Sequence, residues 1–425
     1  MMKIKIKDDD FINDLIITFV GQMLVMILSF ILNKVISNQY SVESFGVYNL
    51  IKRSASVVSF MMLMAMGIAI PKYIAEATEK KNAKETESYM LSGLFIILSA
   101  FVVISTVLLI FQDFFSELMF KDRNAVVLIL PICLFSLGSS IVTYVYSFYR
   151  GVNNFVKYNR VNLIMQMGML LLAFAAPRNF VALHYIWSAF LIIYGILGIW
   201  GIFKNNNISF YHLSEKLFTL KTMLEYAVPR VPGECILFAY NLVPLVIITD
   251  KFGLENVAYF SAALSINSLI SPLFSLVGTI LLPLVSKSLV NNNKENMVQK
   301  IRILGWMYLI VSVLAVLVVY FIGEWLLILL YNKNYVQCIN IVKITILSIV
   351  PNAFYLLLRN PLDGISKYPY NTICLLISFV VYVGVLAIAP TMEVCGIALI
   401  LAYSLLGGLS FAFWKYALKK TGLKE

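Results

Sequence analysis

Long uninterrupted apolar runs dominate this chain. The stretch SGLFIILSAFVVISTVLLIF, residues 92–111, contains no charged side chain. A bilayer core of about 30 Å is crossed by about 20 mainly apolar residues in an α-helix. Runs of this kind recur along the whole chain, whereas membrane β-strands would give short alternating segments. The pattern therefore predicts a polytopic, all-α membrane protein.

Twelve membrane spans are expected. The runs lie at about 11–33, 47–70, 89–111, 125–148, 159–176, 183–203, 223–249, 257–285, 303–330, 340–358, 371–390 and 394–414. The first run is of full membrane length and lacks a small-residue cleavage pattern, so it is expected to remain as an anchor.

Composition and charge predict how the chain is oriented in the membrane. Hydrophobic residues make up 60% of the chain and charged residues 13%, against roughly a quarter charged in soluble proteins. Most of the 33 lysines and arginines fall in the two tails and in the loops after even-numbered spans. The positive-inside rule then predicts that both termini are cytoplasmic. Topology accounts for the net charge of +11, and nucleic-acid binding is not expected.

Cysteines and histidines give no sign of a metal or cofactor. The five cysteines are scattered without CxxC spacing, and His184 and His212 lie far apart near span ends. Metal sites draw ligands from short, fixed spacings. We therefore expect no disulfide framework, no metal and no cofactor.

The two halves of the chain resemble each other at an offset of 212 residues. QYSVESFGVYN (39–49) aligns with KFGLENVAYFS (251–261), and Pro71 aligns with Pro283. The basic loops that follow the two prolines also coincide. Such alignment indicates a duplicated six-helix unit.

A parallel repeat of this kind predicts two lobes. Transporters built from repeats form lobes that rock about a central site. We predict an N-terminal six-helix lobe at 1–203, a cytoplasmic linker at 204–222 and a C-terminal six-helix lobe at 223–425.

Three motifs carry a family resemblance. FGVYNL followed by MGIAIPKYIAE lies after the first span, YRGVNNFVKYN (149–159) after the fourth, and YAVPRVPGE (226–234) opens the seventh. Together with length and span count, they resemble the polysaccharide-transport branch of the MOP superfamily, which contains the Wzx-type flippases of O-antigen and capsule repeat units.

The resemblance implies a fold, a substrate and a place in the cell. Two six-helix lobes would face a cavity that opens alternately to either side of the bacterial cytoplasmic membrane. The implied partner is an oligosaccharide linked to undecaprenyl diphosphate, within the surrounding membrane lipids. Polysaccharide polymerases and glycosyltransferases of the same pathway are further expected partners, and the chain itself is expected to be a monomer.

The start of the seventh span combines charges with helix breakers. Arg230 and Glu234 are four residues apart and share one helix face, while Pro229, Pro232 and Gly233 predict a bent or broken helix there. One interpretation is an ion pair near the membrane surface, where long side chains reach water. The other is a cavity-facing arginine that a carboxylate holds until a diphosphate competes.

Other candidate substrate-binding residues lie in three more places. Lys52 and Arg53 are adjacent in the second span, Lys343 lies near one end of the tenth, and Asn241 lies in the seventh. Adjacent helical residues point about 100° apart, so at most one of Lys52 and Arg53 faces a narrow site directly. Arginine suits a diphosphate because its planar fork matches phosphate oxygens. Both cations also fit a role at the headgroup level.

Amides and tyrosines within the spans suit sugar hydroxyls, since each offers a donor and an acceptor. Contacts between helices are the commoner use of such residues. Asn241 belongs to this set, which also contains Asn33, Asn49, Tyr144, Tyr146 and Tyr240.

Four function classes are weighed. The leading hypothesis is a lipid-linked oligosaccharide flippase, and a MATE-type exporter of drugs or cations is the alternative. Excess positive charge within the spans disfavours a cationic cargo. A lipid II flippase is disfavoured because the first span lacks arginines, and an enzyme because no acid, base or nucleophile cluster is present.

Overall fold

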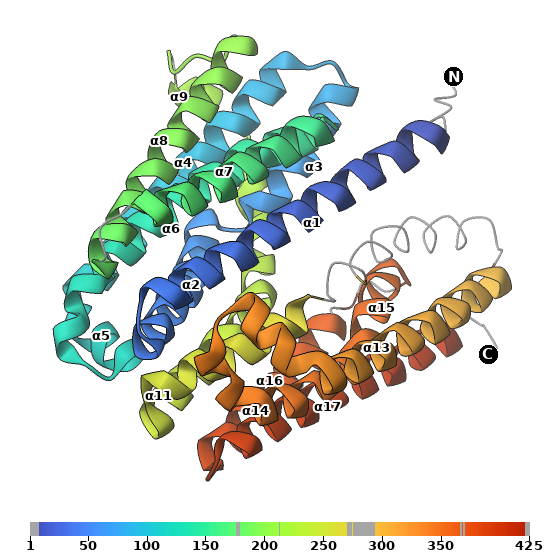
Figure 1. Cartoon of the computed structure of the whole chain (residues 1–425). Coiled ribbons are helices and arrows are strands. Elements are labelled where there is room, and N and C mark those ends of the chain that lie inside the picture. Colours follow the sequence, from blue (N-terminus) through green and yellow to red (C-terminus); the bar gives the residue numbers. More distant parts are fainter. Residues whose placement is uncertain are drawn as a thin grey trace. The chain divides into compact units, whose positions relative to one another are not determined.

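The computed structural model describes residues 8–175, 179–211, 213–269, 274, 294–365, 368 and 370–420. Every element in these ranges is helical (Figure 1). The helices are α1 Asp8–Gln39, α2 Val42–Leu63, α3 Met66–Glu79, α4 Ala83–Ile110, α5 Gln112–Phe120, α6 Ile129–Gly151, α7 Phe155–Ala175, α8 Phe180–Asn205, α9 Leu213–Lys216, α10 Leu220–Ala227, α11 Val231–Ser268, α13 Lys294–Leu330, α14 Ile339–Thr345, α15 Ile349–Ile365, α16 Tyr370–Ile388 and α17 Met392–Lys420. Short 3-10 segments are η1 Arg123–Leu128, η2 Val228–Arg230, η3 Lys333–Cys338 and η4 Ile346–Ser348.

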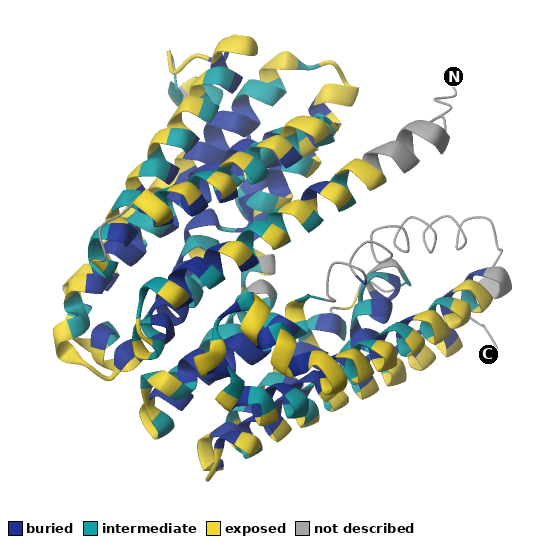
Figure 2. Ribbon diagram, viewed as in Figure 1, coloured by how far each residue is buried: buried dark blue, intermediate teal, exposed yellow. Residues whose placement is uncertain are grey.

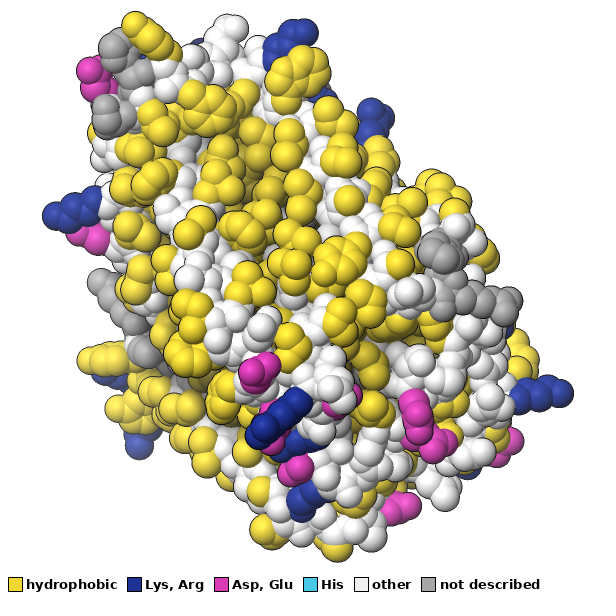
Figure 3. All heavy atoms as spheres, turned by 90° about the vertical axis from the view of Figure 1, so that its left-hand side faces the viewer, with side chains coloured by type: hydrophobic (Ala, Val, Ile, Leu, Met, Phe, Trp, Pro, Cys, Tyr) yellow, Lys and Arg dark blue, Asp and Glu magenta, His cyan; other side chains and the backbone are white. Residues whose placement is uncertain are grey.

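The helices present apolar side chains to their surroundings. Val103 of α4 is 62% exposed and Phe321 of α13 is 84% exposed, and yellow exposed positions recur along the helices in Figure 2. In the space-filling view, hydrophobic side chains cover much of the face shown (Figure 3). Exposed apolar area on this scale marks a surface that is not in water. The expected multi-pass, all-α membrane protein is confirmed.

The spans of the described residues are consistent with the twelve expected spans. Nine helices are long and apolar enough to cross a membrane, or ten if the bent pair α2 and α3 is one span. The expected fifth span is α7, where polar side chains such as Asn159 and Gln166 lower the hydropathy. The expected seventh span and the start of the eighth both lie in α11, and most of the eighth lies outside the described residues.

Residues of the chain make most of their contacts within one of two compact units, Met1–Leu242 and Val243–Glu425. The first unit therefore contains the expected linker and the first turns of α11. The division at 204–222 stays a prediction about the two lobes.

Glycines bring α6 and α8 into close contact in the first unit. A Cβ atom on Gly138 would lie 2.6 Å from Cβ of Leu191 and 3.1 Å from the backbone nitrogen of Ile192. A Cβ atom on Gly195 of α8 would lie 2.5 Å from Cγ2 of Ile141. Small residues at helix crossings are how membrane helices gain packing where the hydrophobic effect is absent.

The break between α2 and α3 lies where the sequence gives little warning. Met64 and Ala65 both adopt left-handed backbone conformations, with φ of 47° and 57°, and the two helices differ in direction by 41°. Pro71, expected to end the second span, instead lies inside α3. Neither Met64 nor Ala65 is a residue type that favours this conformation, so local pattern predicts no break there.

Two equivalent backbone features support the internal repeat. Ser41 interrupts α1 and α2 in an extended conformation, and Gly253, its partner at the 212 offset, interrupts α11 with φ of 81° and ψ of 173°. In the first unit Asp122 accepts a hydrogen bond from the backbone of Asn124 and begins η1. Asn332 does the same with Asn334 and begins η3 in the second unit.

We predict that Gly138→Ala destabilises the protein by about 1–3 kcal/mol, because its Cβ meets backbone atoms of α8 and overpacks the crossing. Thermal unfolding of the detergent-purified protein checks this. Gly201→Ala in α8 is the matched control, since no atom lies within 4 Å of a Cβ placed there. Equal unfolding temperatures for the two variants would contradict close α6–α8 packing.

Candidate functional site

Among the described residues, an arginine within an apolar helix is bonded where α2 meets the start of α11. Arg53 Nη1 donates a hydrogen bond to Oδ1 of Asn241 over 3.0 Å. Further along the same two helices, the rings of Phe60 and Phe238 stack with centroids 5.0 Å apart. Since the residue number rises on α2 as it falls on α11, the two segments run antiparallel. These two contacts hold the first turns of α11 against α2.

Arg53 and Lys52 lie against different neighbours, as their 100° separation requires. Both side chains are half-buried. The Lys52 ammonium lies 5.6 Å from the ring centroid of Tyr48. Tyr48 in turn packs beside His184 and Trp187 of α8, with ring centroids 6.3 and 6.1 Å away. Lys52 therefore borders an aromatic cluster within the first unit, while Arg53 faces α11.

The irregular start of the seventh span is confirmed in the backbone. The chain leaves α10 at Ala227, passes through η2 and enters α11 at Val231. The side chains of Arg230 and Glu234 lie outside the described part of the structure, so their pairing stays a prediction. Lys343 is half-buried in α14 of the second unit.

Several polar residues in the spans serve contacts inside the first unit. The Tyr144 hydroxyl donates to the carbonyl of Met90 over 2.8 Å in the buried core. The Asn49 amide donates to the carbonyl of Phe45 over 2.9 Å, and Asn33 accepts from Tyr48 over 3.4 Å. Buried polar groups with such partners stabilise packing, and these three residues make contacts within and between helices.

Histidine and cysteine offer no ligand group in the described residues. His184 is 2% exposed, and its Nδ1 lies 2.8 Å from the carbonyl of Phe180 one turn earlier. Across these ranges no group of three or more His, Cys, Asp or Glu side chains is placed to hold a metal ion. His212, which the sequence predicts not to be a metal ligand, lies outside the described residues.

The three motifs singled out in the sequence meet at α3. The Lys72 ammonium lies 4.1 Å from the ring centroid of Tyr226, which belongs to the motif that opens the seventh span. Tyr73 and Tyr226 make an edge-to-face contact at 5.5 Å. On the other side, a Cβ on Gly151 would lie 2.8 Å from Cβ of Ile74. The three motifs therefore pack together around α3 in the first unit, although they lie far apart in the sequence.

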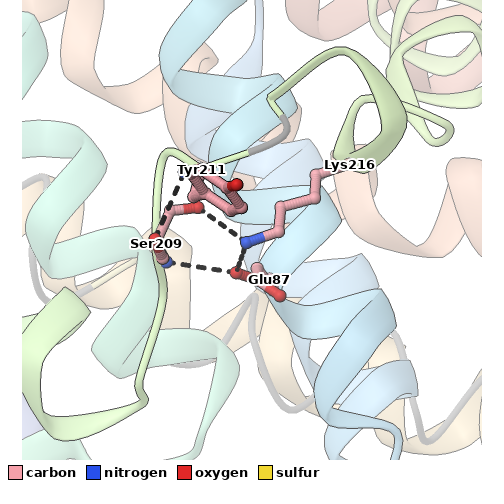
Figure 4. A network of polar contacts seen from close by, with 4 residues as sticks. All are labelled: Glu87, Ser209, Tyr211 and Lys216. Atoms are coloured by element: carbon pink, nitrogen blue, oxygen red, sulfur yellow. Dashed lines mark hydrogen bonds and ion pairs between the residues drawn. The ribbon is translucent and has the colours of Figure 1, made fainter.

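A polar network fixes the segment before α10 to α4 (Figure 4). Lys216 Nζ donates to Oε1 of Glu87 over 2.7 Å and to the carbonyl of Ser209 over 2.9 Å. The backbone nitrogen of Ser209 donates to the same carboxylate oxygen over 3.1 Å, and that of Tyr211 donates to Oγ of Ser209 over 3.2 Å. One carboxylate therefore joins two points of the segment that the sequence predicts to be a linker.

A hydroxyl cluster continues this attachment. Thr219 Oγ1 lies 2.9 Å from Oγ of Ser88 and 3.1 Å from Oγ of Ser92, all buried. The next turns bury Met223 against α4, beside Gly93. The linker is consequently part of the first unit up to the start of α11.

Comparison with known proteins places the chain in a family. The profile described as "Polysaccharide biosynthesis protein" matches residues 11–289. The chain belongs to this family. A second profile, described as MatE, matches residues 229–388. No curated protein sequence matches the chain.

Solved structures show the fold of this polysaccharide biosynthesis protein. An inward-facing multidrug resistance MATE transporter of the MOP superfamily is similar with a TM-score of 0.81 and 13% identity, covering 94% of this chain and 96% of that one. A MOP superfamily transporter from Pyrococcus furiosus Vc1 (DSM3638) is similar with a TM-score of 0.70 and 14% identity, covering 97% and 96%. The family match confirms the predicted polysaccharide family, and the solved structures show that the chain has the fold of MOP superfamily transporters.

We predict that Glu87→Ala releases the 206–219 segment of this family member. Chymotrypsin cleavage after the exposed residues Phe210 and Tyr211 should then rise roughly fivefold, since lost hydrogen bonds to a charged group amount to about 1 kcal/mol or more at a partly exposed site. Cleavage of the purified protein, followed by mass spectrometry, measures it.

Glu225→Ala is the matched control, because it removes only the exposed Lys221–Glu225 pair on α10. Equal cleavage rates in the two variants and the unchanged protein would show that Glu87 does not hold this segment against α4.

Proposed function

We propose that this protein is a flippase that moves undecaprenyl-diphosphate-linked oligosaccharide repeat units across the bacterial cytoplasmic membrane by alternating access, for a surface polysaccharide. Membership in the polysaccharide biosynthesis family supports the substrate class, and the transporter fold supports the mode of action. Both termini would be cytoplasmic, and a polymerase and glycosyltransferases would act on the same repeat unit.

The observation that carries the proposal is Arg53, bonded to Asn241 where two apolar helices meet. An arginine in a membrane helix costs about 2.5–3.5 kcal/mol and is normally retained for function in a bundle interior or wet cavity. Asn241 orients the guanidinium through an amide oxygen and brings no charge of its own. A diphosphate supplies both the charge and the paired oxygens that suit the planar fork.

The same contact suggests how binding is coupled to movement. Asn241 lies at the end of the first unit, and α11 continues beyond Leu242 as part of the second. A diphosphate that replaces Asn241 on Arg53 would break the hydrogen bond between α2 and α11 and leave the stacking of Phe60 on Phe238. The released segment of α11 would then turn about this stacked contact. Arg230 and Glu234 are proposed to assist the same headgroup, and Lys52 and Lys343 remain proposed substrate-binding residues of the first and the second unit.

A MATE-type exporter of cations is the second candidate, because the MatE profile and multidrug transporters match. Cationic cargo calls for a site with excess negative charge. The Pyrococcus furiosus relative is described as having a binding pocket of reverse polarity that suggests a different function. That description, together with Lys52 and Arg53 here, favours an anionic cargo for this chain.

Transport in vesicles tests the proposal. Purified protein should translocate a lipid-linked oligosaccharide, and Arg53→Ala should slow it roughly 10- to 100-fold, since hydrogen bonds to charged groups contribute about 1.5–3 kcal/mol. Arg53→Lys should fall between, because it keeps the charge and loses the fork. Arg123→Ala is the control, an exposed arginine paired with Glu117 over 2.9 Å.

The outcomes separate the candidates. Ethidium movement without glycolipid movement would favour the exporter and overturn the flippase. Normal glycolipid transport by Arg53→Ala would keep the flippase and remove Arg53 from its mechanism.

A further inference from the structure

A groove lies on the second unit, and none of the candidate substrate-binding residues is among the described residues that line it. It is formed by α13, α15 and α17 as two adjoining cavities of about 380 and 480 Å³. Phe354 of α15 and Phe411 of α17 line both cavities, so the two form one continuous depression. Trp306 and Phe411 are 63% and 48% exposed, which shows that the groove opens to the surroundings of the helices.

The length of the groove suits one leaflet of a bilayer. Along α17 its lining residues extend from Leu418 to Ile400, and the cation Lys415 lies near the first of these ends. At 1.5 Å per residue, Lys415 and Ile400 are about 22 Å apart, which is close to half of a bilayer of about 40–45 Å that includes its headgroups. Apart from Ser404 near its far end, the groove beyond Phe411 is lined by apolar side chains and glycine. An acyl chain fits this shape and lining.

Charge distinguishes one end of the groove from the other. Arg302 of α13 and Lys415 of α17 both line it, and no carboxylate is among the described residues that line either cavity. The Lys415 ammonium lies 4.9 Å from the ring centroid of Phe411, so its charge sits at the mouth of the apolar part. Among the described residues no carboxylate forms an ion pair with Arg302. An anionic headgroup above an apolar chain complements this arrangement.

The middle of the groove has unfilled space at a glycine. A Cβ atom on Gly408 of α17 would have no atom within 4 Å, although Gly408 lines the second cavity. Its neighbour Gly407 is different, since a Cβ there would lie 2.5 Å from the carbonyl oxygen of Pro351. Gly407 thus brings α17 onto α15, and Gly408 leaves the groove open beside that crossing.

We propose that this groove binds an anionic phospholipid, with the phosphate at Arg302 and Lys415 and one acyl chain lying along α15 toward Gly408. The occupant is a membrane phospholipid rather than the transported glycolipid, because the groove holds about one leaflet of chain and an undecaprenyl tail is far longer. The proposal is independent of the cargo that the protein carries.

Tryptophan fluorescence gives a direct test. Trp414 lines the groove and is 5% exposed, so a full-length variant that keeps only this tryptophan reports contact by a lipid inside it. Brominated phosphatidylglycerol, diluted in unlabelled phosphatidylcholine, should quench Trp414 at a roughly 25-fold lower mole fraction than brominated phosphatidylcholine. This estimate takes about a fivefold gain for each of two cations near an anionic lipid.

Paired variants locate the headgroup and the chain. Arg302→Gln with Lys415→Gln should abolish the preference for phosphatidylglycerol, while Lys300→Gln with Lys419→Gln on the same helices should retain it. Gly408→Phe should reduce quenching by both lipids because it fills the groove. Gly384→Phe in α16, where a Cβ also has no atom within 4 Å, should leave quenching unchanged.

Three results would overturn the proposal. They are equal quenching by the two brominated lipids, a preference that survives the Arg302 and Lys415 changes, and displacement of brominated phosphatidylglycerol by undecaprenyl diphosphate at lower concentration than by phosphatidylglycerol. The last would assign the groove to the cargo's tail. Arg302 and Lys415 are exposed, so their replacement tests the proposal even if Gly408→Phe does not fold.

Discussion

The cost of placing charge and unpaired polar groups in hydrocarbon shapes this protein throughout. It explains why buried hydroxyls and amides such as Tyr144 and Asn49 find carbonyl partners, as the low-dielectric interior requires. It also makes Arg53 informative, because an arginine at this depth is expensive unless a partner or water receives it. Asn241 is one such partner, and the proposed diphosphate is another that adds opposite charge.

Much of the fold could be predicted from the sequence, since the dominant signal is the length of apolar runs. The 212-residue offset likewise predicts the equivalent interruptions at Ser41 and Gly253. The break at Met64–Ala65 could not be predicted, because neither residue has an intrinsic preference for a left-handed backbone. Tertiary packing of α3 in the core of the first unit outweighs that local preference.

The candidate site was only partly predictable. Residue type and depth singled out Arg53, but its partner Asn241 is 188 positions away and no local spacing connects them. The same holds for Glu87 and Lys216, whose ion pair turns an expected linker into part of the first unit. The three family motifs were visible as strings, yet only the structure shows that Lys72, Tyr226 and Gly151 surround one helix.

Water access to position 53 tests the central claim most directly. In a chain whose five native cysteines are replaced, Arg53→Cys should react with a charged, water-soluble thiol reagent, because only a solvated thiolate reacts. Val103→Cys on an exposed apolar face of α4 should stay unreactive in vesicles. If the cysteine at position 53 is as inert as the one at 103, then position 53 is not in contact with water and Arg53 does not face a cargo cavity.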